Sequence, residues 1–223
     1  MKKIIALILA CLMLTMSFVA CNKTEPETTT EPTDNQTEAP AVDQTEEQTE
    51  EVVELPYANA LELINIVFNG YNATATEDTM LYVAGGNINN FETTSMEGPA
   101  AFVALADSDY NDNLGIPESE ASKIASAASM FNMMNTNVFN CYTVQFAAGT
   151  DVDASIEAIK AQVLARQWIC GAPEKLVIVK MPGDCILVVW GAVQFGGIVD
   201  PFAASIATLV EGATTVVEHS FAQ

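Results

Sequence analysis

The sequence predicts an α+β domain from about residue 56 to the C-terminus, and three observations support that fold class. Half of the 223 residues are hydrophobic, so the chain can form a sizeable core. After residue 55, stretches with the 3.6-residue period of a helix alternate with runs rich in β-branched residues. Between residues 138 and 221 these stretches follow the order strand, helix, strand, strand, helix, strand.

The first helix is predicted immediately after residue 56. Large apolar residues recur there at spacings of 4, 3, 4 and 3, which places them on one helix face, and Gly70 stands near its end. These residues are Tyr57, Leu61, Ile64, Phe68 and Tyr71. Residues 80–84 then predict a short strand that Gly85-Gly86 stops.

A second N-terminal helix is predicted from Pro117 to about Ser129, because small and apolar residues share one side of the helical period. These residues are Ala121, Ile124, Ala125 and Ala128. Residues 87–116 carry no comparable period. The domain therefore has additional N-terminal helices ahead of the six-element order.

The six-element order begins with a strand over residues 138–147, which are rich in β-branched and aromatic side chains. Asp151 predicts the capped start of a helix that runs to about Gln167. The apolar face of that helix comprises Val152, Ile156, Ile159 and Val163.

Two strands, one helix and an edge strand complete the order. Residues 175–181 and 184–192 predict a hairpin with its turn at Pro182-Gly183. Asp200-Pro201 predicts a helix start, with Asp as the N-cap and Pro at the first helical position. Residues 214–221 alternate as an edge strand does.

This order is that of the ferredoxin-like split βαβ fold, in which the first and third strands are central and both helices lie on one face. The predicted third strand is apolar on both faces from Cys185 to Trp190. A strand that is apolar on both sides needs cover on both. We therefore expect the N-terminal helices or a second subunit to cover the face opposite the two helices of the motif.

Residues 1–20 predict an export signal. Two lysines precede an apolar stretch over residues 4–19, which suits a signal peptide and is short of the about 20 residues that a membrane span needs. Ser17-Phe18-Val19-Ala20-Cys21 then resembles a bacterial lipobox, with Phe18 where Leu is usual. The resemblance implies lipidation of Cys21, by acyl chains such as palmitate, and anchoring on the outer face of the cell membrane. An uncleaved anchor helix is the alternative.

Residues 21–55 predict a disordered acidic tether between the lipid and the domain. Residues 22–55 hold 9 Glu, 2 Asp and a single basic residue, and they have too few apolar side chains to fold. A Thr-rich glycosylated stalk is the alternative. The whole chain has 29 acidic and 8 basic residues, which argues against nucleic acid as a partner.

Four features between residues 110 and 192 form a recognisable set. They are Met130-Phe131-Asn132-Met133-Met134-Asn135, the helix capped by Asp151, Arg166-Gln167-Trp168-Ile169-Cys170, and the Gly183-Asp184 hairpin. Together they resemble a family of uncharacterised lipoproteins from Gram-positive gut anaerobes. The resemblance supports the predicted export and lipid anchoring of the chain, and it supports the predicted fold. That family has no assigned activity, so the resemblance implies no catalytic residue.

Cysteine and histidine chemistry is restricted by number and spacing. Cys141, Cys170 and Cys185 are too far apart for a C-x-x-C redox pair or a zinc knuckle. Cys141 and Cys185 are expected on neighbouring central strands; packing, a disulfide between two of the three cysteines, and a reactive thiol are the alternatives. His219 is the only histidine, which excludes a multi-histidine zinc site, and we expect it on a solvated edge.

Acidic residues gather between residues 107 and 120 and allow three interpretations. Paired carboxylates could catalyse glycoside hydrolysis; the candidates are Asp107, Asp109, Asp112, Glu118 and Glu120. Residues 107–118 also have the ligand spacing of an EF-hand calcium loop, with Asp112 at the position that Gly usually occupies. The calcium ligands would be Asp107, Asp109, Asn111 and Glu118. A solvated acidic loop is the third interpretation.

These patterns predict a membrane-anchored extracellular lipoprotein without catalytic activity or cofactor. Its domain would bind a protein or a cell-wall component, or assemble with copies of itself. A surface hydrolase that acts on carbohydrate or wall material through acidic residues is one alternative. A calcium-stabilised adhesion module is the other.

Overall fold

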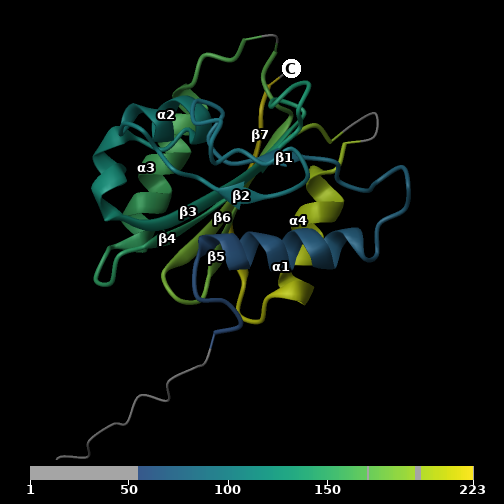
Figure 1. Ribbon diagram of the computed structural model, residues 1–223, viewed down its shortest axis with the longest axis horizontal. Coiled ribbons are helices and arrows are strands. Elements are labelled where there is room, and N and C mark those ends of the chain that lie inside the picture. The colour runs from purple at the N-terminus through teal and green to yellow at the C-terminus, as the bar shows by residue number, and fades with distance from the viewer. Residues whose placement is uncertain (1–54, 170, 194–196, 223) are drawn as a thin grey trace, which may run out of the picture. The chain divides into compact units, whose positions relative to one another are not determined.

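The computed structural model describes residues 55–169, 171–193 and 197–222. These residues form an α+β domain in which helices cover both faces of a seven-stranded antiparallel sheet (Figure 1). The predicted fold class is thereby confirmed. The signal peptide, Cys21, residues 21–54 of the tether and Cys170 lie outside the described residues. Among the described residues, no helix is long and apolar enough to cross a membrane.

The sheet has the strand order β1-β3-β4-β6-β5-β7, and β2 pairs with β3 beside β1. The elements in chain order are α1 (Ala60–Asn72), β1 (Ala84–Gly85), β2 (Ala100–Ala101), α2 (Ser108–Leu114), the 3-10 segment η1 (Glu118–Lys123), β3 (Ile124–Phe131), β4 (Phe139–Phe146), α3 (Val152–Ala165), β5 (Lys175–Met181), β6 (Cys185–Gly191), α4 (Val199–Leu209) and β7 (Thr214–Ser220).

The ferredoxin-like strand order is not confirmed. The first half of the motif is present, because β6 lies between β4 and β5 and is antiparallel to both. In the ferredoxin-like order the last strand would lie beside β4. Here β7 pairs with β5, and the outer edge of β4 pairs with β3.

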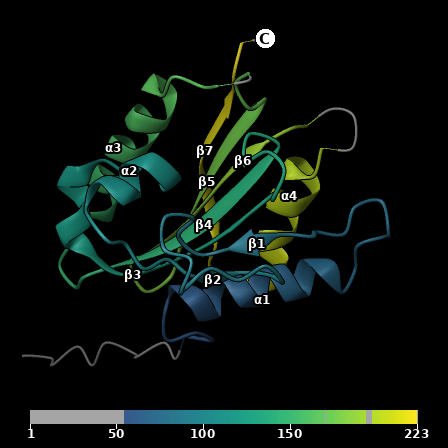
Figure 2. The same ribbon diagram turned by 45° about the horizontal axis from the view of Figure 1, so that its top comes forward.

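The position of β7 also decides which face each helix covers. The chain makes two crossover connections, β4–α3–β5 and β6–α4–β7. Each passes over one intervening strand, and both move along the sheet in the same direction. Their starting strands, β4 and β6, run antiparallel to each other. Because such crossovers are right-handed, α3 and α4 lie on opposite faces (Figure 2). The prediction that both helices share one face is therefore wrong. The N-terminal helices do complete the cover, since α1 joins α4 and α2 joins α3.

Two hydrophobic cores result, one on each face of the sheet. The first lies against α1 and α4, and the second against α2 and α3. Side chains of β6 alternate between the cores, with Cys185, Leu187 and Val189 in the first and Ile186, Val188 and Trp190 in the second. The prediction that this strand is covered on both faces is confirmed.

Residues 117–129 do not form the predicted helix. Only Glu118–Lys123 is helical, as a 3-10 segment, and Ile124–Phe131 forms β3, which pairs with β4 along its length. Ala128, one of the residues that suggested a helix, packs in the core beside α1, and Ser126 Oγ accepts a hydrogen bond from Ala60 N at 3.0 Å. Strand pairing outweighs the helix propensity of alanine here.

The short strand predicted over residues 80–84 is displaced toward its C-terminal end. Strand β1 is Ala84–Gly85, so it contains the first glycine of the pair that was expected to stop it. A Cβ atom on Gly85 would meet backbone atoms of Ala100 and Ser129, so only glycine allows this close approach.

The helices around the first core confirm the predicted helix positions. The buried face of α1 comprises Ala60, Leu63, Ile64, Val67 and Tyr71, while the predicted Leu61 and Phe68 are half-buried. Gly70 lets α1 approach α4, since a Cβ there would meet Leu209 Cδ2. The predicted start of α4 is wrong: the helix begins at Val199 with Ile198 as its N-cap, not Asp200. Asp200 lies in the first turn, where it accepts a hydrogen bond from Lys175 Nζ at 2.6 Å.

Candidate functional site

The acidic segment that suggested a calcium loop is helical, and its central carboxylate is buried. Asp109 in α2 accepts hydrogen bonds from the side-chain amides of Asn87 and Asn89, both at 2.9 Å, and from Leu105 N at 2.7 Å. The bonds from Asn89 and Leu105 hold the pKa of Asp109 below its ordinary value. Asp109 therefore connects two loop segments, residues 87–89 and 105–106, to α2.

The other candidate calcium ligands are separate from Asp109. Asp107 precedes α2 and is exposed, and Glu118 is exposed in η1. Asn111 Oδ1 accepts a hydrogen bond from Gln162 Nε2 in α3 at 2.8 Å. Within the described residues, no group of three or more His, Cys, Asp or Glu side chains could hold a metal ion.

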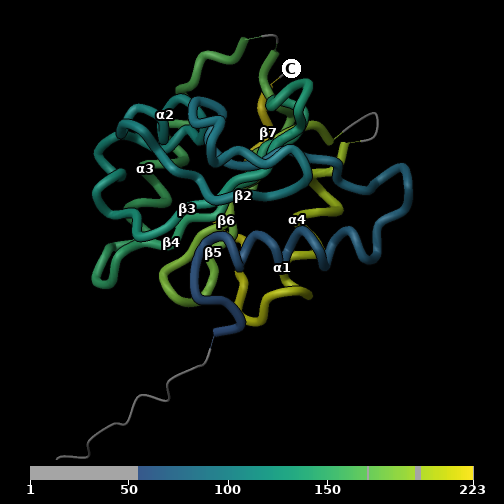
Figure 3. Tube along the Cα trace, in the orientation of Figure 1, coloured from purple at the N-terminus to yellow at the C-terminus, as the bar shows by residue number. Residues whose placement is uncertain are grey.

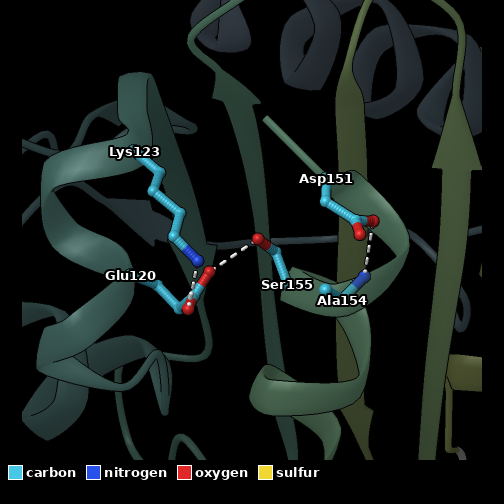
Figure 4. Close-up of polar contacts among 5 residues, drawn as sticks. All are labelled: Glu120, Lys123, Asp151, Ala154 and Ser155. Atoms are coloured by element: carbon cyan, nitrogen blue, oxygen red, sulfur yellow. Dashed lines mark hydrogen bonds and ion pairs between the residues drawn. The ribbon is translucent and has the colours of Figure 1, made fainter. Parts of the chain in front are cut away.

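A second buried carboxylate has a structural role. Glu120 accepts hydrogen bonds from Lys123 Nζ at 2.7 Å and from Ser155 Oγ at 2.6 Å (Figure 4). Burial alone would raise the pKa of Glu120, but the two hydrogen bonds and the charge of Lys123 outweigh it and lower the pKa. Ser155 is completely buried, so this group joins η1 to α3 and is closed to substrate. Asp151 caps α3 beside it, as predicted, through Ala154 N at 3.0 Å.

Four hollows lined by described residues contain no carboxylate pair. Glu97 is the only acidic residue among the linings of these hollows. Of the five candidate catalytic acids, Asp109 and Glu120 are buried and hydrogen-bonded, and Asp107, Asp112 and Glu118 are exposed. The spacing that glycoside hydrolysis needs across a cleft is therefore not present at these hollows.

Cys141, Cys185 and His219 lie on the strands predicted for them. Cys141 and Cys185 are buried and free on the neighbouring strands β4 and β6. Burial raises the pKa of both thiols, that of Cys185 to about 12, so neither is a thiolate at neutral pH. His219 lies on the edge strand β7, half-buried, with its ring against Phe221 at a centroid distance of 5.2 Å.

A groove of about 480 Å³ opens at the end of the sheet where β3 turns into β4. We call it the Met–Trp groove. Half of its lining is apolar: Ile88, Phe131, Met133, Met134, Trp168 and Ile169. The other half is polar: Asn132, Asn135, Thr136, Asn137, Arg166 and Gln167. An apolar hollow with a few polar groups is the usual form of a ligand site.

The two chain segments that line this groove are held together by one side chain. Asn137 Nδ2 donates to Ile169 O at 2.8 Å and to Gly171 O at 2.7 Å. Figure 3 shows the tube that follows α3 reaching the turn between β3 and β4. Residues 130–135 and 166–169, which stand about 30 residues apart in the sequence, thus form the two sides of one groove.

Arg166 has the most unusual environment in the groove. Its guanidinium lies over the ring of Trp168, with Cζ 5.1 Å from the ring centroid, and Nη2 donates to Asp112 O at 2.7 Å. Burial lowers the pKa of Arg166, while the charge of Asp112 raises it, and an arginine with such a shift remains cationic at neutral pH.

Beneath the groove, five buried polar atoms have no hydrogen-bond partner among the described residues. They are Arg166 Nη1, Trp168 Nε1, Trp190 Nε1, Tyr142 Oη and Asn140 Oδ1. Their side chains are contiguous: the Trp190 ring meets those of Trp168 and Tyr142 at centroid distances of 5.7 and 5.9 Å, and Asn140 pairs with Trp190 across β4 and β6. Unpaired buried polar groups are rare and concentrate at functional sites.

Comparisons of the chain with protein-family models, with curated proteins and with solved structures found no match. The resemblance over residues 110–192 to uncharacterised lipoproteins stays a prediction.

The sequence analysis names segments from both sides of the groove but does not predict that they lie next to each other. Segments 130–135 and 166–170 were singled out only because they carry the family resemblance. Asn140 and Tyr142 are not among the predicted site residues, and Trp190 enters the sequence analysis only as part of the apolar run from Cys185 to Trp190. The available signal was a polar Asn and a Tyr hydroxyl at alternate positions of an apolar central strand, which places two polar groups on the same buried face.

Proposed function

We propose that this chain is a lipid-anchored, non-catalytic binding module on the outer face of the cell membrane, with the Met–Trp groove as its binding site. The proposed location on the membrane is supported by the sequence, in which an apolar signal stretch ends at Cys21 and an acidic tether follows. A tethered domain of this kind meets proteins and wall components outside the cell. Its ligand is a molecule from either class or another copy of the chain.

The groove is the observation that carries the proposed binding role. Its volume of about 480 Å³ exceeds the about 410, 130 and 30 Å³ of three other hollows lined by described residues, and large apolar side chains lie exposed on its walls. Met134 is 96% exposed and Ile169 is 84% exposed, although both are apolar. Apolar residues gathered at one concave place favour an interaction site, whereas single exposed ones need no explanation. Among the described residues, the lining holds no carboxylate, cysteine or histidine that could act as an acid–base pair.

Site-specific photo-cross-linking on intact cells tests this proposal. A benzophenone amino acid replaces Met134 or Ile169 in the full chain, and the cells that express the variant are irradiated. We expect both variants to give the same discrete cross-linked product, because the two residues form opposite sides of one groove. Mass spectrometry of the product identifies a protein, a wall fragment or a second copy of the chain.

Leu105 is the matched control. It is apolar and 69% exposed, and it lines none of the four hollows. The same photo-reactive residue at position 105 should give no product of that mass. Equal capture from positions 105 and 134, or no capture from either groove position, would remove the groove as the binding site.

A further inference from the structure

The Met–Trp groove contains a cationic side chain in an acidic domain. Residues 55–222 contain 18 acidic and 5 basic side chains, and none of the acidic ones lines the groove. The four lysines among the described residues each form an ion pair. Arg166, the fifth basic residue there, has no carboxylate within 4.0 Å and lines the groove. The groove therefore has a cation without a close counter-ion.

The amide side chains add hydrogen-bond donors to that cation. Asn132 Oδ1 accepts the backbone N–H groups of Met134 and Asn135, at 3.0 and 3.1 Å. Asn135 Oδ1 accepts the N–H of Asn137 at 2.9 Å. The turn thus occupies both lone pairs of Asn132 Oδ1 and one of Asn135 Oδ1, and the NH₂ groups of both side chains are left to donate to a ligand.

The buried polar atoms beneath the groove show the same excess of donors. Arg166 Nη1 and the two indole nitrogens can only donate, and Asn140 Oδ1 can only accept. Burial raises the pKa of Tyr142 well above its ordinary value, so its hydroxyl keeps the proton and can also donate. Of these four potential donors, only those of Arg166 and Trp168 belong to residues that line the groove, while Tyr142 and Trp190 are buried in the core below. The side chains at the groove thus offer donors rather than acceptors, which favours a ligand rich in acceptor oxygens.

The apolar half of the lining restricts the ligand further. Met133 and Met134 on one side and Ile169 on the other are exposed beside the donors. Methionine side chains adapt their shape to varied apolar partners. A ligand that complements this groove carries an anionic, acceptor-rich group next to an apolar group.

We propose that the Met–Trp groove binds the free carboxyl terminus of a peptide whose last side chain is apolar. The proposal rests on the binding function proposed above and specifies its ligand. The terminal carboxylate accepts hydrogen bonds from Arg166 and from the NH₂ groups of Asn132 and Asn135, since arginine and amide donors recognise carboxylates by geometry and charge. The apolar side chain lies against Met133, Met134 and Ile169.

Titration of the full chain with matched short peptides tests the ligand class. The probes are N-acetylated tripeptides that end in Leu, Met or Phe, each as the free acid and as the C-terminal amide. Trp168 lines the groove and is one of only two tryptophans, so its fluorescence reports binding, and calorimetry covers peptides that leave it unchanged. We expect saturable binding of at least one free acid, with the matching amide weaker by about tenfold or more.

Arg166→Gln and Lys160→Gln form the matched pair of variants. Both remove one positive charge close together in the chain, but Lys160 is paired with Glu157 and lies outside the groove. Arg166→Gln should weaken binding of the free acid by about tenfold and leave the amide unaffected, whereas Lys160→Gln should change neither. If Arg166→Gln fails to fold, the comparison of acid with amide on the unaltered chain decides alone.

Equal affinity for acid and amide, or no saturable binding of any free acid, would overturn the carboxylate proposal. The cross-linking experiment separates that failure from failure of the binding function. If groove positions still capture a product on cells, the groove binds a ligand of another class. Without any capture, the proposed function fails as well.

Discussion

Replacement of Phe202 by alanine is expected to lower the free energy of unfolding by about 3–5 kcal/mol, because it removes a completely buried ring from the first core. Phe202 in α4 meets the rings of Tyr71 and Phe139 at centroid distances of 5.3 and 5.5 Å, both edge to face. One side chain thus joins α4 to α1 and to β4. Denaturant unfolding followed by circular dichroism measures the loss.

Phe91 provides the control for this substitution. It is the same residue type but is 82% exposed, so Phe91→Ala should change the free energy of unfolding by no more than about 0.5 kcal/mol. A loss below about 1 kcal/mol for Phe202→Ala would mean that α4 does not pack on the face shared with α1.

Asp109→Ala is expected to cost about 2–4 kcal/mol of stability, because the substitution leaves several buried donors without an acceptor. The amides of Asn87 and Asn89 and the N–H groups of Leu105 and Ala106 all donate to this carboxylate. Asp107→Ala is the control, since Asp107 is exposed and its side chain makes no capping bond to α2. Thermal and denaturant unfolding of the three proteins measure the difference.

Acidification gives a second measurement on the same carboxylate. Because the pKa of Asp109 is lower in the folded chain, its stabilising contribution is complete above the unfolded pKa of about 4 and is lost as the pH falls through the folded value. The difference between the unaltered chain and Asp109→Ala should therefore be constant from pH 7 to about 5 and shrink below about pH 4. A difference that stays constant to pH 2 would contradict the hydrogen-bonded carboxylate.

Local patterns predicted much of the fold because they depend on side chains close in the sequence. The apolar period gave the position of α1, the Asp151 cap gave the start of α3, and the β5–β6 hairpin follows from two apolar runs around Gly183. The rule that a doubly apolar strand needs two covered faces correctly predicted helices on both sides of β6.

Strand β3 shows why the topology could not be predicted. Within residues 124–131, Ile124, Ala125 and Ala128 stand at helical spacing, and the pairing with β4 makes the segment a strand. Once β3 occupies the outer edge of β4, β7 has no place there and pairs with β5. A single wrong assignment of secondary structure thus changed both the strand order and the face that α4 covers.

The candidate site could be predicted only in pieces, because it depends on contacts between distant residues. Sequence reasoning selected residues 130–135 and 166–170, yet Asn137, whose amide joins the two segments, lies outside both. The acidic residues between 107 and 120 were instead the candidates for a metal or catalytic site. Their spacing alone could not show that Asp109 would be buried within a helix. Overall charge did not indicate the groove either, because its cationic residue is Arg166 in a chain with 29 acidic residues.

Hydrogen–deuterium exchange across the whole domain tests the central claim, that the Met–Trp groove is the binding site, most directly. The full chain is compared alone and with a detergent extract of envelopes from cells in which the groove cross-links to a partner. We predict slower exchange confined to peptides that contain residues 131–137 and 166–169. Protection over the outer surfaces of α1 and α4, or no protection anywhere, would contradict the claim.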